Sequence, residues 1–219
     1  MGQKVFAELL AMQVIPRVDY QLGEQLQLQP RHTSLGIVTL TIDDVGYTAI
    51  DEATKNAEVD VVYAKSFYAG AAHASGPLSG EMIGILASSS PDEIHSAFET
   101  IRQKISYDAY FEEVGNLGGH AIYAHTVSSC GSYLAEVANV PIGSALAYLI
   151  APPLEAVVGL DAALKAADVQ LQVFFGPPSE TNFGGGLLTG SQSACKAAAD
   201  AFREAIERVA AQPIAEEGY

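Results

Sequence analysis

The stretch DEATKNAEV at residues 51–59 returns in altered form as DAALKAADV at residues 161–169, 110 positions further along the chain. Asp, Ala, Lys, Ala and Val stand at alternate, identical positions in both copies. At helical spacing each copy also carries an apolar stripe, Tyr47, Ile50, Thr54 and Ala57 in the first and Val157, Leu160, Leu164 and Ala167 in the second. The two stretches are therefore predicted to be equivalent helices.

The similarity continues on both sides of these helices. Leu22, Glu24 and Pro30 resemble Leu134, Glu136 and Pro141, and Ala97-Phe98 resembles Ala201-Phe202. Each copy is therefore about 95 residues long. Two copies are too few for a solenoid, so a duplicated domain that forms a symmetric assembly is expected. We place the first domain at residues 1–111 and the second at residues 112–219.

Each copy alternates predicted strands with predicted helices, which indicates an α/β fold of the α+β sandwich type. The last helix of the first copy is the clearest, because Ser90, Pro91 and Glu93 form a start signal ahead of an apolar stripe. A long Ala-rich helix is expected from about Gln192 to Ala210. Strands are predicted at 9–15, 35–42, 59–66, 81–88, 121–127, 145–150, 169–175 and 187–188.

Acidic residues outnumber basic residues by 26 to 11, which gives a formal net charge of −15. Such a chain repels phosphate backbones and anionic lipid, so neither nucleic acid nor a membrane is an expected partner. A small cation fits the charge better. No apolar run approaches the roughly 20 residues of a membrane span, and no signal-peptide core follows the N-terminus, so a cytoplasmic location is expected.

Catalytic motifs are absent from the sequence. It contains no nucleophile elbow, phosphate-binding loop or dinucleotide fingerprint, and its five histidines lack zinc-protease spacing. His120 and His125 stand five apart in a predicted strand and would face opposite sides, and Cys130 and Cys195 lack metal-type spacing. We therefore predict that the chain is not an enzyme, has no catalytic residue and holds neither a metal nor a cofactor.

The positions at which the two copies differ are the most informative about function. Asp43 and Asp44 open the first repeat helix, whereas Pro153 and Leu154 stand in their place in the second copy. Adjacent carboxylates at a helix start can simply cap the helix. Alternatively, they form an acidic pocket for an ammonium group, to which Glu81 adds a third carboxylate.

Two segments rich in small residues, Tyr68 to Gly80 and Gly176 to Gly186, follow equivalent predicted strands. The second contains the triplet Gly184, Gly185 and Gly186 directly after Phe183. Paired polar loops of this kind can be moving surface elements, and they can equally be plain connections.

Nine short runs, in order from Ser34 to Gln192, resemble one family, the tandem-domain shell proteins of ethanolamine-utilisation bacterial microcompartments, known as EutL. They include Asp43-Asp44-Val45, Asp51-Glu52-Ala53-Thr54-Lys55, Tyr68-Ala69-Gly70-Ala71-Ala72, Ala151-Pro152-Pro153-Leu154 and Leu188-Thr189-Gly190-Ser191-Gln192. The resemblance implies two circularly permuted shell domains, each a mostly antiparallel sheet flanked by helices. It also implies a homotrimer that tiles with other shell proteins into a pseudo-hexagonal layer.

The same resemblance implies a function for particular residues. Asp43, Asp44, Glu81 and Phe111 would line a small acidic pore that binds ethanolamine or a similar ammonium compound. Loops that gate a larger central pore for metabolites or cofactors would include Tyr68, Ala69, Gly70, His73, Asn182, Phe183, Gly184 and Gly185. Phe111 falls in a divergent segment, 106–119, that is predicted to link the two copies.

Two other classes of function remain open at this point. The chain can be a ligand-sensing regulatory binding module, in which the acidic site controls a partner. It can also be a carrier that binds cobalamin or a metal.

Overall fold

The computed structural model describes residues 2–68, 76–114 and 119–214. By its contacts the chain divides into two compact units. The first unit contains Phe6–Tyr110 together with Cys130–Val137, and the second contains Met1–Val5, Phe111–Ser129 and Ala138–Tyr219. Relative to a boundary after residue 111, Met1–Val5 and Phe111 fall in the second unit, and Cys130–Val137 falls in the first.

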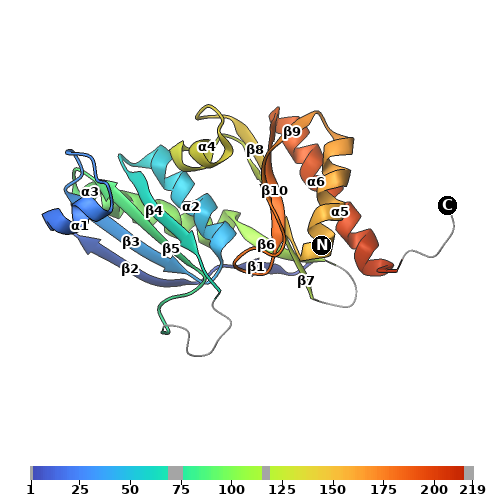
Figure 1. Ribbon diagram of the computed structural model, residues 1–219, viewed down its shortest axis with the longest axis horizontal. Helices are drawn as coiled ribbons and strands as arrows, with labels where there is room; N and C mark the ends of the chain where they lie inside the picture. The colour runs from blue at the N-terminus through green and yellow to red at the C-terminus, as the bar shows by residue number, and fades with distance from the viewer. Residues whose placement is uncertain (1, 69–75, 115–118, 215–219) are drawn as a thin grey trace. The chain divides into compact units, whose positions relative to one another are not determined.

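The first unit is built on a four-stranded antiparallel sheet (Figure 1). Its strand order is β2 (Leu9–Ile15), β3 (Ser34–Leu40), β5 (Met82–Ser88) and β4 (Asp60–Ser66). Two long helices pack against this sheet, α2 (Asp43–Asn56) and α3 (Pro91–Gln103). The short helices α1 (Tyr20–Gln25) and α4 (Ser132–Ala138) and a π-helical turn η1 (Lys104–Asp108) complete the unit.

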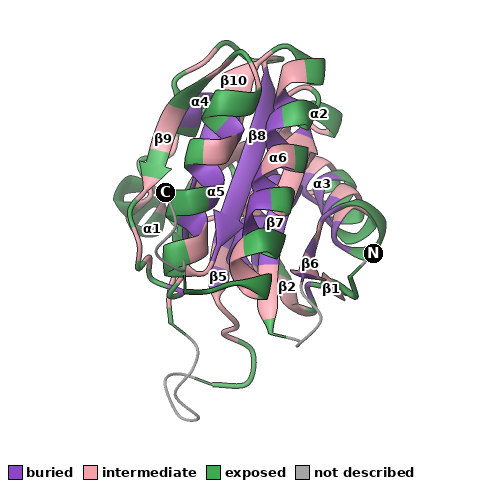
Figure 2. Cartoon of the chain, turned by 90° about the vertical axis from the view of Figure 1, so that its right-hand side faces the viewer, coloured by how far each residue is buried: buried purple, intermediate pink, exposed green. Residues whose placement is uncertain are grey.

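A six-stranded sheet forms the framework of the second unit. Its order is β1 (Lys4–Phe6), β6 (Tyr110–Val114), β7 (His120–Val127), β8 (Ala145–Ala151), β10 (Gly184–Gly190) and β9 (Val169–Phe175). Helices α5 (Pro153–Ala166) and α6 (Gln192–Ala211) pack on it and on each other. Every residue of β8 is buried, whereas the outer faces of the two helices are exposed (Figure 2).

Most of the predicted elements are confirmed. The repeat helices are α2 and α5, and each begins eight residues before the quoted repeat. Ser90 caps α3 by accepting a hydrogen bond from the Asp92 N–H at 3.1 Å, with Pro91 as the first helical residue. The fold class is confirmed as an α+β arrangement with antiparallel sheets.

Two predictions about the connections were wrong. The segment 106–119 is more than a linker, because Tyr110–Val114 forms β6 and pairs with β7. Gly184 and Gly185 belong to β10 and not to a loop, since they pair with Ala151 and Ile150 of β8. A Cβ at Gly185 would lie 1.9 Å from the Leu149 carbonyl oxygen, so glycine allows the two strands to approach at this point.

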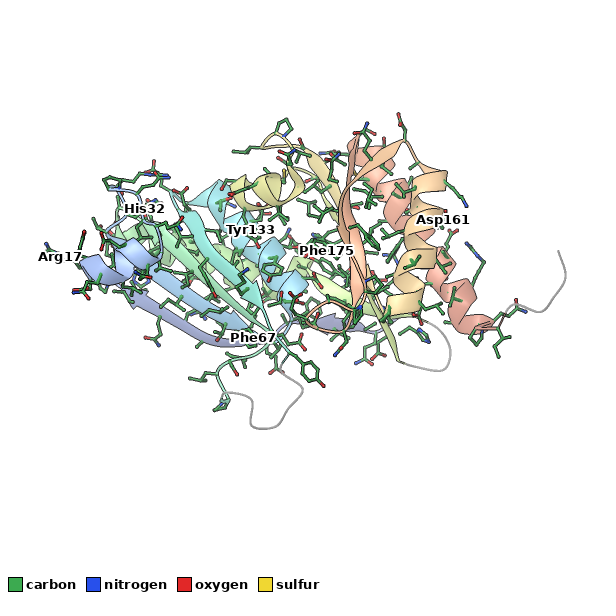
Figure 3. All side chains as sticks on the ribbon, in the orientation of Figure 1. Arg17, His32, Phe67, Tyr133, Asp161 and Phe175 are labelled. Carbon is green, nitrogen blue, oxygen red and sulfur yellow. The ribbon has the colours of Figure 1, made fainter. Side chains whose placement is uncertain are left out.

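The segment Cys130–Val137 follows the first copy of the repeat in sequence but packs within the first unit. The carboxylate of Asp51 on α2 accepts hydrogen bonds from the backbone N–H groups of Gly131, at 2.7 Å, and Leu134, at 2.8 Å. Tyr133, which Figure 3 labels, packs beside Tyr47, and the ring centroids are 5.8 Å apart. The start of α4 is thereby attached to the middle of α2.

Among the described residues, the structure contains no helix that is both long enough and apolar enough to span a bilayer.

Candidate functional site

The three predicted acidic residues lie within the first unit, on neighbouring ends of α2 and β5. Asp43 and Asp44 occupy the first turn of α2, where the helix dipole favours negative charge. Both are buried, at 6% and 7% exposure. Glu81 immediately precedes β5, and its backbone N–H donates to the Leu40 carbonyl oxygen at 2.9 Å.

Ordinary helix capping accounts for only part of this arrangement. Ile42 at the N-cap offers no side-chain hydrogen bond, and an oxygen of Asp43 accepts the Asp44 N–H at 2.9 Å. Asp43 therefore satisfies one backbone donor of the helix start. Capping gives no reason for a third carboxylate at position 81.

The electrostatics of the site favour a cation. Burial raises the pKa of Asp43, although hydrogen bonds from Ser66 and from the Asp44 backbone oppose the increase. Burial, together with the nearby charge of Asp43, raises the pKa of Glu81 to about 7. Two carboxylates close enough to repel each other are stabilised when a positive charge lies between them.

Two hydroxyl groups extend the site beyond the predicted residues. Ser66, the last residue of β4, hydrogen-bonds to Asp43, and its Oγ lies 2.5 Å from the hydroxyl oxygen of Tyr47. Neither residue was predicted to belong to the site; Tyr47 was predicted only as part of the apolar stripe of its helix. No motif marks Ser66, because its relevance depends on the pairing of β4 with β5, which brings Ser66 opposite Met82.

Phe111 belongs to the second unit and not to the unit that holds the three acids. It lies on β6, stacks on Tyr123 with ring centroids 5.2 Å apart and meets Phe183 edge-on at 5.7 Å. Its side chain is 4% exposed. Within its own unit, Phe111 is part of an aromatic cluster.

The two candidate loops differ in how much of each the structure describes. Tyr68 is exposed after β4, whereas Ala69, Gly70 and His73 lie outside the described residues. In the second loop Asn182 has a φ of 68° and donates its backbone N–H to the Ser179 carbonyl oxygen at 3.0 Å. Phe183 is the last residue before β10.

The described part of the chain shows no group of three or more His, Cys, Asp or Glu side chains arranged to hold a metal ion. His120, which was considered as a ligand together with His125, has its Nδ1 2.9 Å from a carboxylate oxygen of Glu155. Both cysteines are buried as free thiols.

Comparison with known proteins gives a consistent result, although no family model matches the chain. A bacterial microcompartment shell protein EutL from Clostridium perfringens is 54% identical over 206 residues, covering 94% of this chain and 95% of the relative. The crystal structure of ethanolamine utilisation protein EutL from Leptotrichia buccalis superposes with a TM-score of 0.94 at 53% identity, covering 98% of this chain and 99% of that one.

A more distant structure shares the fold alone. The trimeric bacterial microcompartment shell protein PduB superposes with a TM-score of 0.76 at 22% identity, over 94% of this chain and 90% of that chain. The relatives are named as shell proteins, so the chain is a structural protein and not an enzyme. The chain belongs to the EutL family, the bacterial microcompartment shell proteins of ethanolamine utilisation.

Proposed function

We propose that this shell protein forms homotrimeric tiles with two kinds of opening. One is a small acidic pore at Asp43, Asp44 and Glu81 that binds ethanolamine or a similar small ammonium compound. The other is a central pore for metabolites or cofactors, gated by residues 68–80 and 176–183. The tile joins other shell proteins at its edges.

The observation that carries this proposal is the placement of three carboxylates, those of Asp43, Asp44 and Glu81, at neighbouring ends of α2 and β5. A carboxyl group whose pKa is raised to about 7 by burial and by Asp43 loses its proton more readily when an ammonium ion enters. Such an ion offers several N–H donors to the carboxylates, and charge-assisted hydrogen bonds of this kind are strong. Ethanolamine also carries a hydroxyl group, for which Ser66 and Tyr47 are suitable partners beside Asp43.

The pocket is tested by calorimetric titration of the full-length protein with ethanolamine at pH 8, where Glu81 is mostly ionised. Asp43→Asn and Glu81→Gln should each weaken binding by about 1.5–3 kcal/mol, the contribution of a hydrogen bond to a charged group. Glu99→Gln on α3 is the matched control, because Glu99 is 71% exposed. Unchanged affinity in both site variants would show that these carboxylates do not bind the amine.

Protonation of Glu81 should also make binding depend on pH. Below pH 7 the carboxyl group holds its proton and the site lacks one negative charge. Affinity for ethanolamine should therefore rise between pH 6 and pH 8 in the wild type, by up to about tenfold per pH unit below the folded pKa. The same pH change should have a smaller effect in Glu81→Gln. An equal pH dependence in both proteins would exclude Glu81 as the group that titrates.

The assembly is tested by light scattering and electron microscopy of the same sample. A tile should have three times the chain mass of 23.0 kDa and form flat arrays. A discrete oligomer that forms no arrays and changes shape with the ligand would instead support a sensing module. Visible absorbance gained from cobalamin would support a carrier.

A further inference from the structure

The first unit contains a groove that is separate from the three acids of the candidate site. Its volume is about 660 Å³, within the range of about 300–1,000 Å³ that is usual for small-molecule sites. It is lined by Glu52 and Asn56 of α2, by Thr100 and Gln103 of α3, and by three residues of η1. All of these elements belong to the first unit.

The two copies of the repeat differ at this groove. Three of its lining side chains are replaced by alanine at the equivalent positions of the second copy: Glu52 by Ala162, Asn56 by Ala166 and Tyr107 by Ala211. A side chain that the duplicated fold requires should tend to occur in both copies. The polar lining is therefore a property of the first copy and not a requirement of the fold.

The backbone differs between the copies at the same place. In the second copy α6 continues as a regular α-helix to Ala211. In the first copy α3 ends at Gln103 and η1 follows as a π-helical turn, in which the Lys104 carbonyl oxygen accepts the Ala109 N–H at 3.0 Å. Short π-helical segments are rare and are frequent at functional sites. This turn contributes Lys104, Tyr107 and Asp108 to the groove.

The charged groups at the groove compensate one another. The Lys104 ammonium lies 3.5 Å from a carboxylate oxygen of Glu52 and 3.5 Å from one of Asp108, and Lys55 pairs with Glu52 at 2.8 Å. Burial acts to raise the pKa of Glu52, but the hydrogen bond from Lys55 and the charges of Lys55 and Lys104 lower it below its ordinary value. Two carboxylates thus face two ammonium groups. A charged ligand would have to compete with these ion pairs, whereas a neutral ligand would not.

The lining offers both donors and acceptors of hydrogen bonds. The amide groups of Asn56 and Gln103 supply both kinds, and the carboxylate of Asp108, whose side chain is 67% exposed, supplies acceptors. The Thr100 hydroxyl donates to the Ser96 carbonyl oxygen at 3.2 Å, and its own oxygen can still accept. A hydroxyl group is itself both donor and acceptor, so a ligand with several hydroxyl groups matches this lining.

Tyr107 adds an aromatic ring to the groove. The residue is 76% exposed, so water now covers much of a large side chain that has an apolar ring and a polar tip. A sugar has the same mixed character, because its ring carries C–H groups on its faces and hydroxyl groups at its edge. Stacking on Tyr107 would remove apolar surface of both partners from water.

We propose that this groove binds a neutral polyhydroxylated compound, a free sugar or polyol. Tyr107 stacks against the carbon skeleton, and the side chains of Asn56, Gln103 and Asp108 bond the hydroxyl groups. The groove is a second small-molecule site of the shell protein, and it acts independently of the acidic pore proposed above for ammonium compounds.

The first test is a saturation-transfer NMR titration of the full-length protein with maltose. The wild type should bind maltose with a dissociation constant in the millimolar range. Tyr107→Ala should weaken binding at least fivefold, whereas Tyr107→Phe, which keeps the ring, should stay within about twofold of the wild type. Glu99→Ala is the control, because Glu99 lies on α3 with a 71% exposed side chain and does not line the groove. Equal affinities in all four proteins would overturn the proposal.

Amide shifts of the wild type locate the ligand without any substitution, so they remain informative if a variant fails to fold. Maltose should shift the signals of residues 52–56 and 100–108 and leave those of Asp43, Asp44 and Glu81 unchanged. Saturating ethanolamine should not displace it. Maltose that shifts no signal at the groove overturns the proposal, as does displacement of maltose from the groove by equimolar arginine or inorganic phosphate, because the groove would then select charge. Neither result bears on the acidic pore, which the ethanolamine titration tests separately.

Discussion

Asp51 and Asp161 occupy equivalent places in the repeat but have different surroundings. Asp51 is 1% exposed and binds two backbone N–H groups of the α4 segment, whereas the side chain of Asp161 is 62% exposed. Asp51→Ala should lower the free energy of unfolding by about 2–3 kcal/mol, because two buried donors lose their partner. Asp161→Ala should change it by no more than about 0.5 kcal/mol. Urea unfolding at one protein concentration compares the two, and equal losses would contradict the assignment.

Glu81 should make stability depend on pH in the absence of a ligand. Its folded pKa of about 7 lies above the ordinary value of 4.5, so its stabilising contribution is present below pH 4.5 and is lost as pH rises to 7. Solvent screens this half-buried group, so Glu81→Gln should exceed the wild type by about 1–2 kcal/mol at pH 8. The advantage should vanish near pH 4.5. Parallel stability curves would show that Glu81 titrates normally.

At the level of single residues, the sequence predicted which acidic residues form the candidate site, but it did not predict the raised pKa of Glu81. Asp43 and Asp44 were noticed because Pro153 and Leu154 replace them in the second copy. The raised pKa of Glu81 depends on burial and on the proximity of Asp43, and neither is encoded in local sequence. Ser66 was missed for the same reason, since pairing between strands brings it to the site.

Strand β10 shows how a close approach between elements selects glycine. Gly185 has a φ of 156°, and an added Cβ would collide with the Leu149 carbonyl oxygen of β8. Gly185→Ala should therefore lower the free energy of unfolding by about 2 kcal/mol or more. Gly76→Ala is the control, because a Cβ at Gly76 meets no atom within 4 Å. Thermal unfolding of both variants checks this, and a tolerated Gly185→Ala would show that the strands can separate locally.

Helices and strands that local sequence specifies were predicted, whereas strands that form only by pairing with a neighbouring strand were not. Ser90 at the N-cap and Pro91 at the first helical position predict the start of α3 from a few neighbouring residues. The glycines at the start of β10 have low strand propensity, and only β8 and β9 hold them extended. The acidic strand β6 likewise forms by pairing with β7.

For the whole molecule, charge should set the conditions for assembly. Each chain carries a formal net charge of −15, so tiles repel one another in dilute salt. The Debye length falls from about 10 Å at 0.1 M salt to about 3 Å at 1 M. Flat arrays should therefore become more extensive between 0.02 M and 0.5 M sodium chloride, which electron microscopy can measure. Dispersal of the arrays by salt would indicate that ion pairs hold the edges together.

The duplication was evident from sequence, and its two helices α2 and α5 are equivalent. The exchange of α4 into the first unit was not predicted, because self-comparison finds similar segments without showing which neighbour each one contacts. The hydrogen bonds to Asp51 from Gly131 and Leu134, which lie 80 and 83 residues further along the chain, make this exchange visible.

That exchange has a consequence for the order in which the chain is made. Synthesis proceeds from the N-terminus, so residues 130–137 leave the ribosome after every strand of the four-stranded sheet has been made. A nascent chain that has reached only residue 111 holds Asp51 without the two N–H groups that it will bind. The first half can therefore mature only once translation has entered the second. A stop codon between the two copies would yield an immature half in which Asp51 lacks its two N–H donors and Tyr47 lacks the Tyr133 ring, in place of a smaller shell domain.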